Sequence, residues 1–229
     1  MVKSGFYGVT GTSPWLKPPG FNPQVFEKIS KMVEYKRNFL LYNAGDKGEY
    51  VYLILDGRVE HFIISEDGMK KITGISVPGC IVGELPMFDN EPHFCYARVC
   101  ANSRLYRMTY HDFHNIIMKD TILINNILKN MAQKIRSLHT QIAVSEFCDA
   151  SSKIAKILLF ICDDYGVNQG DEILIGITFT HYDIAFMTGL SRVSVSNTLT
   201  RMARDGILRK AGKNYYIKNH AKLEELCEL

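Results

Sequence analysis

Residues 121–147 restrict the fold more than any other stretch, because they contain no glycine or proline and carry a regular apolar stripe. Apolar residues recur there at spacings of 4, 3, 4, 3 and 4, the a/d pattern of a coiled-coil helix. A core helix lying on a β-domain is the alternative, but a domain of about seventy residues cannot cover so long a helix along one seam. The pattern therefore favours a parallel homodimeric coiled coil. The predicted seam consists of Ile124, Leu128, Met131, Ile135, Leu138 and Ile142.

Residues 39–109 have a different pattern, in which short apolar or alternating runs such as YVYLILDGRVEHFIIS and KKITGIS are separated by Gly or Asp-Gly. Many short strands with regular turn signals indicate an all-β sandwich or barrel. Residues 65–68, Ser-Glu-Asp-Gly, form the clearest hairpin turn.

Helical signals flank this β-rich region. Residues 24–35 have apolar residues at helical spacing and predict a short amphipathic helix. Residues 109–112 have the form of a capping box, so a short helix is expected to follow to about residue 119. Residues 151–165 predict a further helix, which Gly166 ends.

The segment HYDIAFMTGLSRVSVSNTLTRM, residues 181–202, is the most specific motif in the chain. It predicts two helices joined at Gly189, where the turn requires a positive φ. Val195 and Leu199 would anchor the second helix, which is expected to end at about Asp205. The motif predicts a helix-turn-helix, with an ordinary helical hairpin as the alternative.

Two short β runs complete this C-terminal region. Residues 207–210 and 214–217 flank Ala211-Gly212 and predict a two-stranded wing, and residues 173–177 predict a strand ahead of the motif.

The second helix of the motif carries side chains suited to base edges. Arg192 can bond guanine O6 and N7 or a phosphate, Asn197 can bond adenine in a bidentate manner, and Val193 can pack on a thymine methyl. The predicted DNA-binding residues are Ser191, Arg192, Val193, Ser194, Ser196, Asn197, Arg201, Arg204 and Lys213.

The distribution of charge supports a polyanion-binding surface in the same place. The chain has a formal net charge of +3, yet residues 192–218 alone contain seven Lys or Arg against one acid. The positive excess therefore lies in the second helix and the wing, and a solvated basic face is the alternative to a polyanion-binding surface. Arg201, Arg204, Arg209 and Lys213 are expected to meet phosphates.

Motifs of other function classes are missing from the sequence. There is no P-loop, no dinucleotide-binding glycine motif, no H-E-x-x-H and no G-x-S-x-G, which argues against an enzyme. The seven histidines and six cysteines lack metal-ligand spacing, so no metal site is expected. Buried free thiols in a reducing compartment are favoured over a redox sensor. With no run of 18 apolar residues and no signal peptide, a cytoplasmic protein without a membrane segment is expected.

The order of these regions resembles the cyclic-AMP-receptor/fumarate–nitrate-reduction (CRP/FNR) family of transcription regulators. The resemblance is carried by YLILDGRVE (52–60), GCIVGELPMF (79–88), SSKIAKILLFI (151–161) and FTHYDIAFMTGLSRVSVSNTLTRMARDGIL (179–208). It implies an α+β fold with a cyclic-nucleotide-binding-like β-roll, a long dimerisation helix and a winged helix-turn-helix. It also implies that the partners are promoter DNA with an imperfect palindrome, a second copy of the chain, and RNA polymerase. The corresponding boundaries are 1–23 for an N-terminal extension, 24–120 for the β-roll, 121–148 for the dimerisation helix and 149–229 for the DNA-binding domain.

Departures from the family pattern bear on the effector. Members that bind cyclic nucleotides have an Arg-Ser pair after Gly-Glu-Leu, whereas this chain has His93-Phe94-Cys95 there. Neither an imidazole nor an aromatic ring can replace Arg in clamping a phosphodiester, so cyclic AMP is not expected. Members of the family with an iron–sulfur cluster have a group of cysteines near the N-terminus, but here no cysteine precedes Cys80, so no cluster is expected. Members that bind haem have a histidine just after the loop that corresponds to 79–85, and this chain has none there, so haem is not expected either.

The remaining possibility is an apolar and aromatic pocket between the β-roll and the dimerisation helix. Such a lining suits a small aromatic or carboxylated organic effector and is similar in character to that of members sensing halogenated phenolic acids. A redox-responsive or effector-independent regulator with an empty pocket is the alternative, as is a dimeric adaptor that binds protein. The predicted effector-binding residues are Gly83, Glu84, Leu85, Met87, His93, Phe94, Tyr96, Leu138 and His139.

Overall fold

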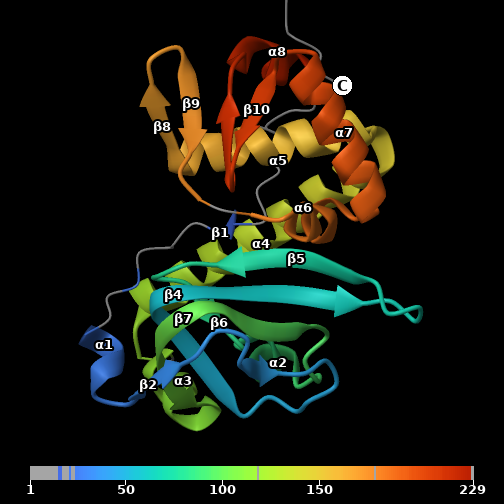
Figure 1. The fold of residues 1–229 in the computed structure, drawn as a ribbon. Coiled ribbons are helices and arrows are strands. Elements are labelled where there is room, and N and C mark those ends of the chain that lie inside the picture. The colour runs from blue at the N-terminus through green and yellow to red at the C-terminus, as the bar shows by residue number, and fades with distance from the viewer. Residues whose placement is uncertain (1–14, 17–20, 22–23, 118, 178, 228–229) are drawn as a thin grey trace, which may run out of the picture. The chain divides into compact units, whose positions relative to one another are not determined.

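The computed structural model describes residues 15–16, 21, 24–117, 119–177 and 179–227 (Figure 1). They form two compact units, and the boundary between these units along the chain falls within one long helix. We call the described residues up to Leu138 the β-roll unit and those from His139 onward the C-terminal unit. Most of the predicted N-terminal extension, residues 1–23, lies outside the described residues. No helix among the described residues is long and apolar enough to cross a membrane.

The β-roll unit contains a sheet with the strand order β1-β5-β4-β7-β2 (Figure 1). In addition, β3 pairs with β7 and β6 pairs with β4. The two central strands are long, because the bulge at Asp56-Gly57 bends the chain without ending the strand. The strands are β1 (Trp15–Leu16), β2 (Lys31–Tyr35), β3 (Leu40–Tyr42), β4 (Tyr50–Ile64), β5 (Lys70–Ser76), β6 (Ile81–Val82) and β7 (Tyr96–Thr109).

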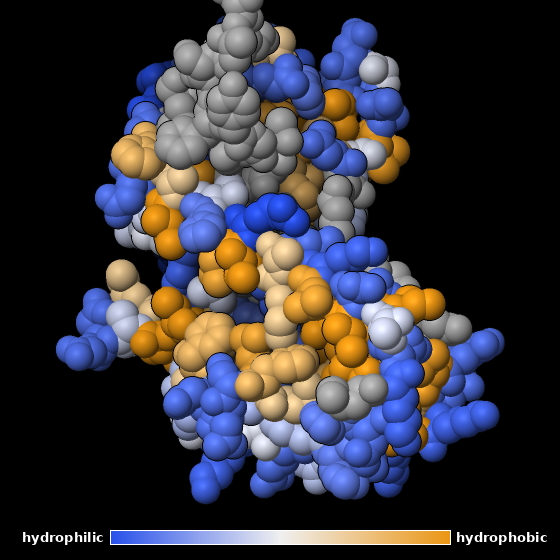
Figure 2. All heavy atoms as spheres, turned by 180° about the vertical axis from the view of Figure 1, so that it is seen from behind, coloured by the Kyte–Doolittle hydropathy of each residue, from blue (hydrophilic) through white to orange (hydrophobic). Residues whose placement is uncertain are grey.

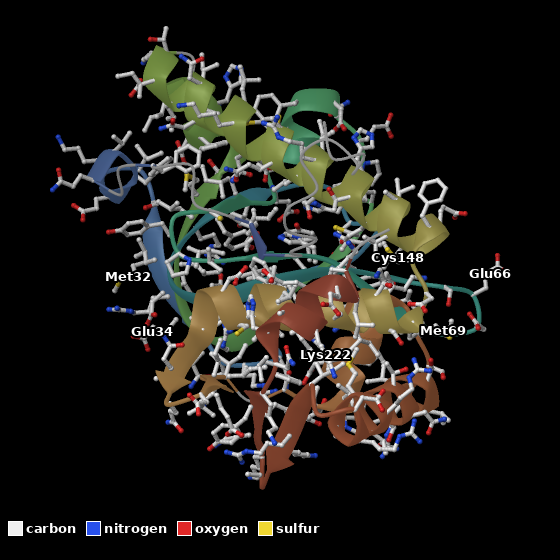
Figure 3. The ribbon with its side chains drawn as sticks, turned by 90° about the horizontal axis from the view of Figure 1, so that it is seen from above. Met32, Glu34, Glu66, Met69, Cys148 and Lys222 are labelled. Atoms are coloured by element: carbon white, nitrogen blue, oxygen red, sulfur yellow. The ribbon has the colours of Figure 1, made fainter. Side chains whose placement is uncertain are left out.

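The predicted hairpin turn at residues 65–68 is confirmed and joins β4 to β5. The Ser65 amide donates to the Met69 carbonyl at 2.9 Å, and Gly68 has a φ of 81°. Glu66 and Met69 stand at the tip of this hairpin (Figure 3).

The prediction of one helix over residues 24–35 is wrong. Only α1 (Gln24–Glu27) is helical, and β2 pairs antiparallel with β7, with Val33 opposite Leu105. Pairing with a strand more than sixty residues away outweighed a local spacing that suits both structures. Met32 and Glu34 point outward along this edge strand (Figure 3).

Four helices belong wholly or partly to the β-roll unit. The Thr109 hydroxyl accepts from the Asp112 amide at 3.1 Å and begins α3, as the predicted cap requires. These helices are α1, α2 (Leu85–Asp89), α3 (Tyr110–Ile117) and the first part of α4 (Thr121–Phe147).

Helix α4 confirms the predicted bounds and has two apolar faces instead of one. Leu123 and Ile127 are buried in the core cluster that also contains Phe26 and Phe113. The predicted seam is offset from this face by one residue. Ile124 and Met131 are half-buried against the same cluster, and Leu128, Ile135 and Ile142 are more than half exposed.

The C-terminal unit packs its helices on a small sheet of order β10-β11-β9-β8. The predicted wing is present as the β10–β11 hairpin, but β9 also pairs with β11, so the wing belongs to a four-stranded sheet. Its elements are α5 (Ala150–Tyr165), β8 (Gly166–Gln169), β9 (Glu172–Ile175), α6 (His181–Thr188), α7 (Arg192–Arg204), β10 (Leu208–Ala211), β11 (Asn214–Ile217) and α8 (His220–Glu225).

Candidate functional site

Helices α6 and α7 form the predicted helix-turn-helix with defined ends. Thr180 and Asp183 make a reciprocal capping box at the start of α6. Gly189 has a φ of 74° and ends α6 in the left-handed conformation that the turn requires. Ser191 caps α7 by accepting from the Ser194 amide at 3.1 Å. The two helices are therefore specified by local sequence at each terminus.

The outer face of α7 presents most of the predicted DNA-binding side chains. Val195, Leu199 and Met202 are buried and hold the opposite face on the core. Val193 is 68% exposed, so an apolar side chain stands in solvent at the start of the helix. The exposed predicted residues are Ser191, Arg192, Val193, Asn197, Arg201, Arg204 and Lys213, and those that are half-buried are Ser194 and Ser196.

Arg192 lies against an aromatic ring that the sequence reasoning did not select. Its guanidinium carbon is 5.0 Å from the centroid of the Tyr182 ring, and Tyr182 is itself 53% exposed. The spacing gives a cation–π contact between the first residue of α7 and the second residue of α6.

The other arginines of the basic region differ in their surroundings. Arg209 bonds Glu172 through Nε and Nη2, at 2.8 and 2.5 Å from Oε2, and stacks on Tyr216. Arg201 donates to the Ser151 hydroxyl on α5. Arg204 forms an ion pair with its neighbour Asp205 at 3.5 Å and is largely exposed. The structure thus places Arg209 in an intramolecular ion pair, although the sequence pattern predicted it to meet phosphate.

A second candidate site is a narrow cavity of about 60 Å³ inside the β-roll unit. It has room for only a few water molecules. Six of the nine predicted effector-binding residues line it, and these are Gly83, Glu84, Leu85, His93, Phe94 and Leu138. The other eight lining residues were not predicted, and these are Leu16, Tyr42, His61, Thr73, Gly74, Pro86, Cys95 and Lys134.

Three predicted residues lie elsewhere. Met87 packs against the core cluster beneath α4, and Tyr96 stacks on Phe62 with ring centroids 5.1 Å apart. His139 is exposed and belongs to the C-terminal unit. Strand alternation explains Tyr96, because its neighbours Cys95 and Ala97 point to the inner side of the sheet.

Glu84 and Lys134 form the charged pair of the cavity. Glu84 is 2% exposed, and its Oε1 accepts from Lys134 Nζ at 2.5 Å. The second carboxylate oxygen, Oε2, is buried without a hydrogen-bond partner. A buried carboxylate needs such a cation, and its unpaired oxygen is a free acceptor. The spacing of Ile127, Asn130 and Lys134 on the buried face of α4 is the signal that could have identified Lys134.

Burial favours the uncharged form of both imidazoles of the cavity. Burial lowers the pKa of His61 to about 3, and its ring nitrogens contact the hydroxyls of Ser76 at 2.9 Å and Tyr42 at 3.5 Å. Burial also lowers the pKa of His93, whose ring stacks on Tyr42 with centroids 3.6 Å apart. Lys134 is therefore the cation of the lining.

The thiols with shifted pKa values are weak nucleophiles. Burial raises the pKa of Cys95, Cys100 and Cys227 to about 11 each, which keeps these thiols protonated at neutral pH. Among the described residues, no group of three or more His, Cys, Asp or Glu is arranged to hold a metal ion.

Family models match both units. Residues 32–120 match the cyclic nucleotide-binding domain, and residues 152–226 match the Crp-like helix-turn-helix domain. The CRP-like cAMP-activated global transcriptional regulator of Mycobacterium tuberculosis (strain H37Rv) is 25% identical over 89% of this chain and 92% of its own length. The anaerobic regulatory protein of Aggregatibacter actinomycetemcomitans is 26% identical over 91% of this chain and 82% of its own.

Solved structures have the same fold. CprK complexed with OCPA superposes with a TM-score of 0.73 at 20% identity, covering 93% of this chain and 98% of its own. A CooA mutant from Carboxydothermus hydrogenoformans superposes with a TM-score of 0.75 at 21% identity, and the match covers 91% of each chain. The two matched domains, in this order and over most of the chain, identify the protein as a member of the CRP/FNR family of transcription regulators.

Proposed function

We propose that this protein is a homodimeric regulator that binds an imperfect palindrome in promoter DNA and is controlled allosterically by a small organic molecule in the β-roll cavity. The observation that carries the DNA-binding part is the outer face of α7. There Arg192, Val193 and Asn197 are exposed together at the start of a helix that is anchored by buried residues and capped at its first turn.

The base contacts follow from side-chain chemistry. Arg192 would bond guanine, Asn197 would bond adenine, and Val193 would pack on a thymine methyl. Two copies of α7 would enter successive major grooves about 34 Å apart, which requires a dimer with two-fold symmetry. RNA polymerase is the further partner that family membership suggests.

The exposed stripe of α4 supports the dimer. Leu128, Ile135 and Ile142 recur every seven residues, and each is more than half exposed. Figure 2 shows apolar side chains gathered on the face of the β-roll unit over which α4 runs. A second copy of the same helix, packed in parallel, would cover this stripe with identical residues.

The cavity favours an effector other than a cyclic nucleotide. Its cation, Lys134, is already paired with Glu84, and the loop that would hold a phosphate contributes neutral His93 and Phe94. The ring-lined walls suit an aromatic or apolar body, and Glu84 Oε2 would accept from a hydroxyl or amide of the ligand. Because the cavity is small, the lining must move to admit such a molecule, and that movement would connect the ligand to α4.

Operator selection tests the DNA-binding part. A random library is selected with the protein, and Arg192→Ala and Asn197→Ala are then measured on the selected site and on random DNA. Each variant should lose about 1–3 kcal/mol per half-site on the selected site and little on random DNA. Equal losses on both would mean that these side chains only position the helix.

Thermal shift and native mass spectrometry test the effector. Millimolar cyclic AMP should leave the Tm unchanged, since a ligand of the native state must raise stability. A saturable increase would contradict the argument from Lys134 and His93. Native mass spectra of the protein purified from its own cells should show a bound small molecule. A dimer that binds DNA and never carries such a molecule would favour an effector-independent regulator.

A further inference from the structure

Tyr182 stands beside the predicted base-contacting residue without being part of α7. It is the second residue of α6, and 53% of its surface is exposed. Its ring lies under the Arg192 guanidinium at 5.0 Å. The helix-turn-helix motif assigns no role to this position beyond helix formation.

The backbone of Tyr182 is fixed by the start of α6, and its ring has two neighbouring side chains. The capping box of Thr180 and Asp183 sets the first turn of α6. The neighbouring His181 contacts the Tyr215 hydroxyl at 3.0 Å, and the Phe186 ring lies 6.1 Å from the Tyr182 ring on the next turn. We call the Tyr182 ring, with Phe186 and Arg192 beside it, the aromatic platform.

The Arg192 guanidinium keeps its hydrogen-bond donors available while it stacks. None of the ion pairs between described residues includes Arg192, whereas Arg209 stacks on Tyr216 and also bonds Glu172. Stacking uses the face of the guanidinium plane, and the N–H donors lie along its edge. A stacked arginine can therefore still bond a guanine in a bidentate manner.

We propose that Tyr182 is a positioning residue for base recognition: its ring holds the Arg192 side chain in an extended, oriented state before DNA arrives. A free arginine loses much rotamer freedom when it binds a base edge. The stack removes part of that loss in the unbound protein, so the contact with the base pair becomes stronger and more selective. This inference rests on the proposed function of Arg192.

The experiment compares Tyr182→Ala, Tyr182→Phe, Arg192→Ala and the double variant Tyr182→Ala/Arg192→Ala on the selected operator. Tyr182→Ala should weaken binding about two- to fivefold per half-site, which is the size of an exposed cation–π contact. Tyr182→Phe keeps the ring and should bind like the original protein. On the Arg192→Ala background, removing Tyr182 should have no further effect. Lys222→Ala, on α8 (Figure 3), controls for an unspecific loss of surface area or charge.

Three outcomes would overturn the proposal. An equal loss in Tyr182→Phe would assign the role to the hydroxyl, as in a direct phosphate contact. Additive losses in the double variant would mean that the two side chains act independently. An equal loss on random DNA would mean that no base is being distinguished.

A measurement without DNA separates this proposal from the proposed function. NMR of the Arg192 Nε–Hε group should report a low mobility that increases in Tyr182→Ala and not in Tyr182→Phe. If the protein selects no operator but the mobility increases in Tyr182→Ala and not in Tyr182→Phe, the stack between Tyr182 and Arg192 exists and the base-reading role proposed for Arg192 is wrong. If the mobility is high and unchanged by Tyr182→Ala, the platform itself is wrong.

Discussion

The recognition surface of the C-terminal unit and the cavity of the β-roll unit differ in where their residues come from. The recognition surface proposed for DNA takes most of its side chains from one stretch, residues 182–204, with Lys213 added by the wing, and presents most of them to solvent. The cavity collects its lining from β1, β3, β4, β5, α2, two loops and α4, and most of that lining is buried or half-buried, although Phe94 is 61% exposed. The first site is built by helix geometry, and the second exists only when distant segments pack together.

The difference has consequences for charge. Exposed cations such as Arg192 remain solvated and can form new bonds without leaving a buried partner. In the Glu84–Lys134 pair the carboxylate is buried and the lysine is largely buried, so removing either member should affect the fold around it. Substitutions in the cavity should therefore change stability, and substitutions on α7 should change DNA binding with little effect on stability.

The largest effect is expected at Lys134. Lys134→Ala leaves the Glu84 carboxylate buried without a cation, which should cost about 3–5 kcal/mol in the free energy of unfolding of the β-roll unit. The double variant Glu84→Gln/Lys134→Met should recover most of this loss. Denaturant unfolding measures both, with Arg136→Ala on the exposed side of α4 as the control. If Lys134→Ala unfolds like the control, the cavity is more solvated than its burial indicates.

The next effect is expected on the exposed stripe of α4. Ile135→Glu would place two like charges on the seam of a parallel pair and should weaken dimerisation by about 2 kcal/mol or more. Sedimentation at micromolar concentration should show monomer, with DNA binding lost in parallel. Lys129→Glu, on an exposed polar position of the same helix, should remain a dimer. An unchanged dimer in Ile135→Glu would show that the stripe is not the interface.

A smaller effect concerns pH and the buried His61. Its pKa falls from 6.5 to about 3 on folding, so the unfolded chain binds a proton that the folded chain excludes between these values. Stability should therefore decrease as the pH falls, by about 1.3 kcal/mol between about pH 7 and 5.5 from this group. His61→Gln should show a correspondingly shallower dependence in unfolding measured across this range. Identical slopes for both proteins would mean that His61 reaches water.

The smallest effect compares two cations of the wing. Lys213 is exposed at the tip of the β10–β11 hairpin, whereas Arg209 is bonded to Glu172. The slope of the logarithm of the DNA-binding constant against the logarithm of the salt concentration should become less steep in Lys213→Ala. The change should be about one per protomer, because one phosphate contact is lost. Arg209→Ala should leave the slope unchanged. A reduction in both would mean that Arg209 leaves Glu172 when DNA binds.

Much of the architecture was predictable because its signals are local. The bounds of α4, the cap of α3, the hairpin turn at 65–68 and Gly189 between α6 and α7 all follow from residues that lie within a few positions of one another. Helical spacing and turn chemistry act over that range, before any tertiary contact forms. The exposed face of α7 follows in the same way, since its buried anchors recur at helical spacing.

The sequence by itself determined the order of the regions, the long helix and the residues on the exposed face of α7. Only the tertiary structure decided that residues 31–35 form a strand, that Arg209 belongs to Glu172 and that Lys134 is the cation of the cavity. In each of these pairs the partners are between 37 and 76 positions apart in the chain. Local periodicity contains no information about such partners, because burial and charge pairing depend on which distant segment packs against a residue.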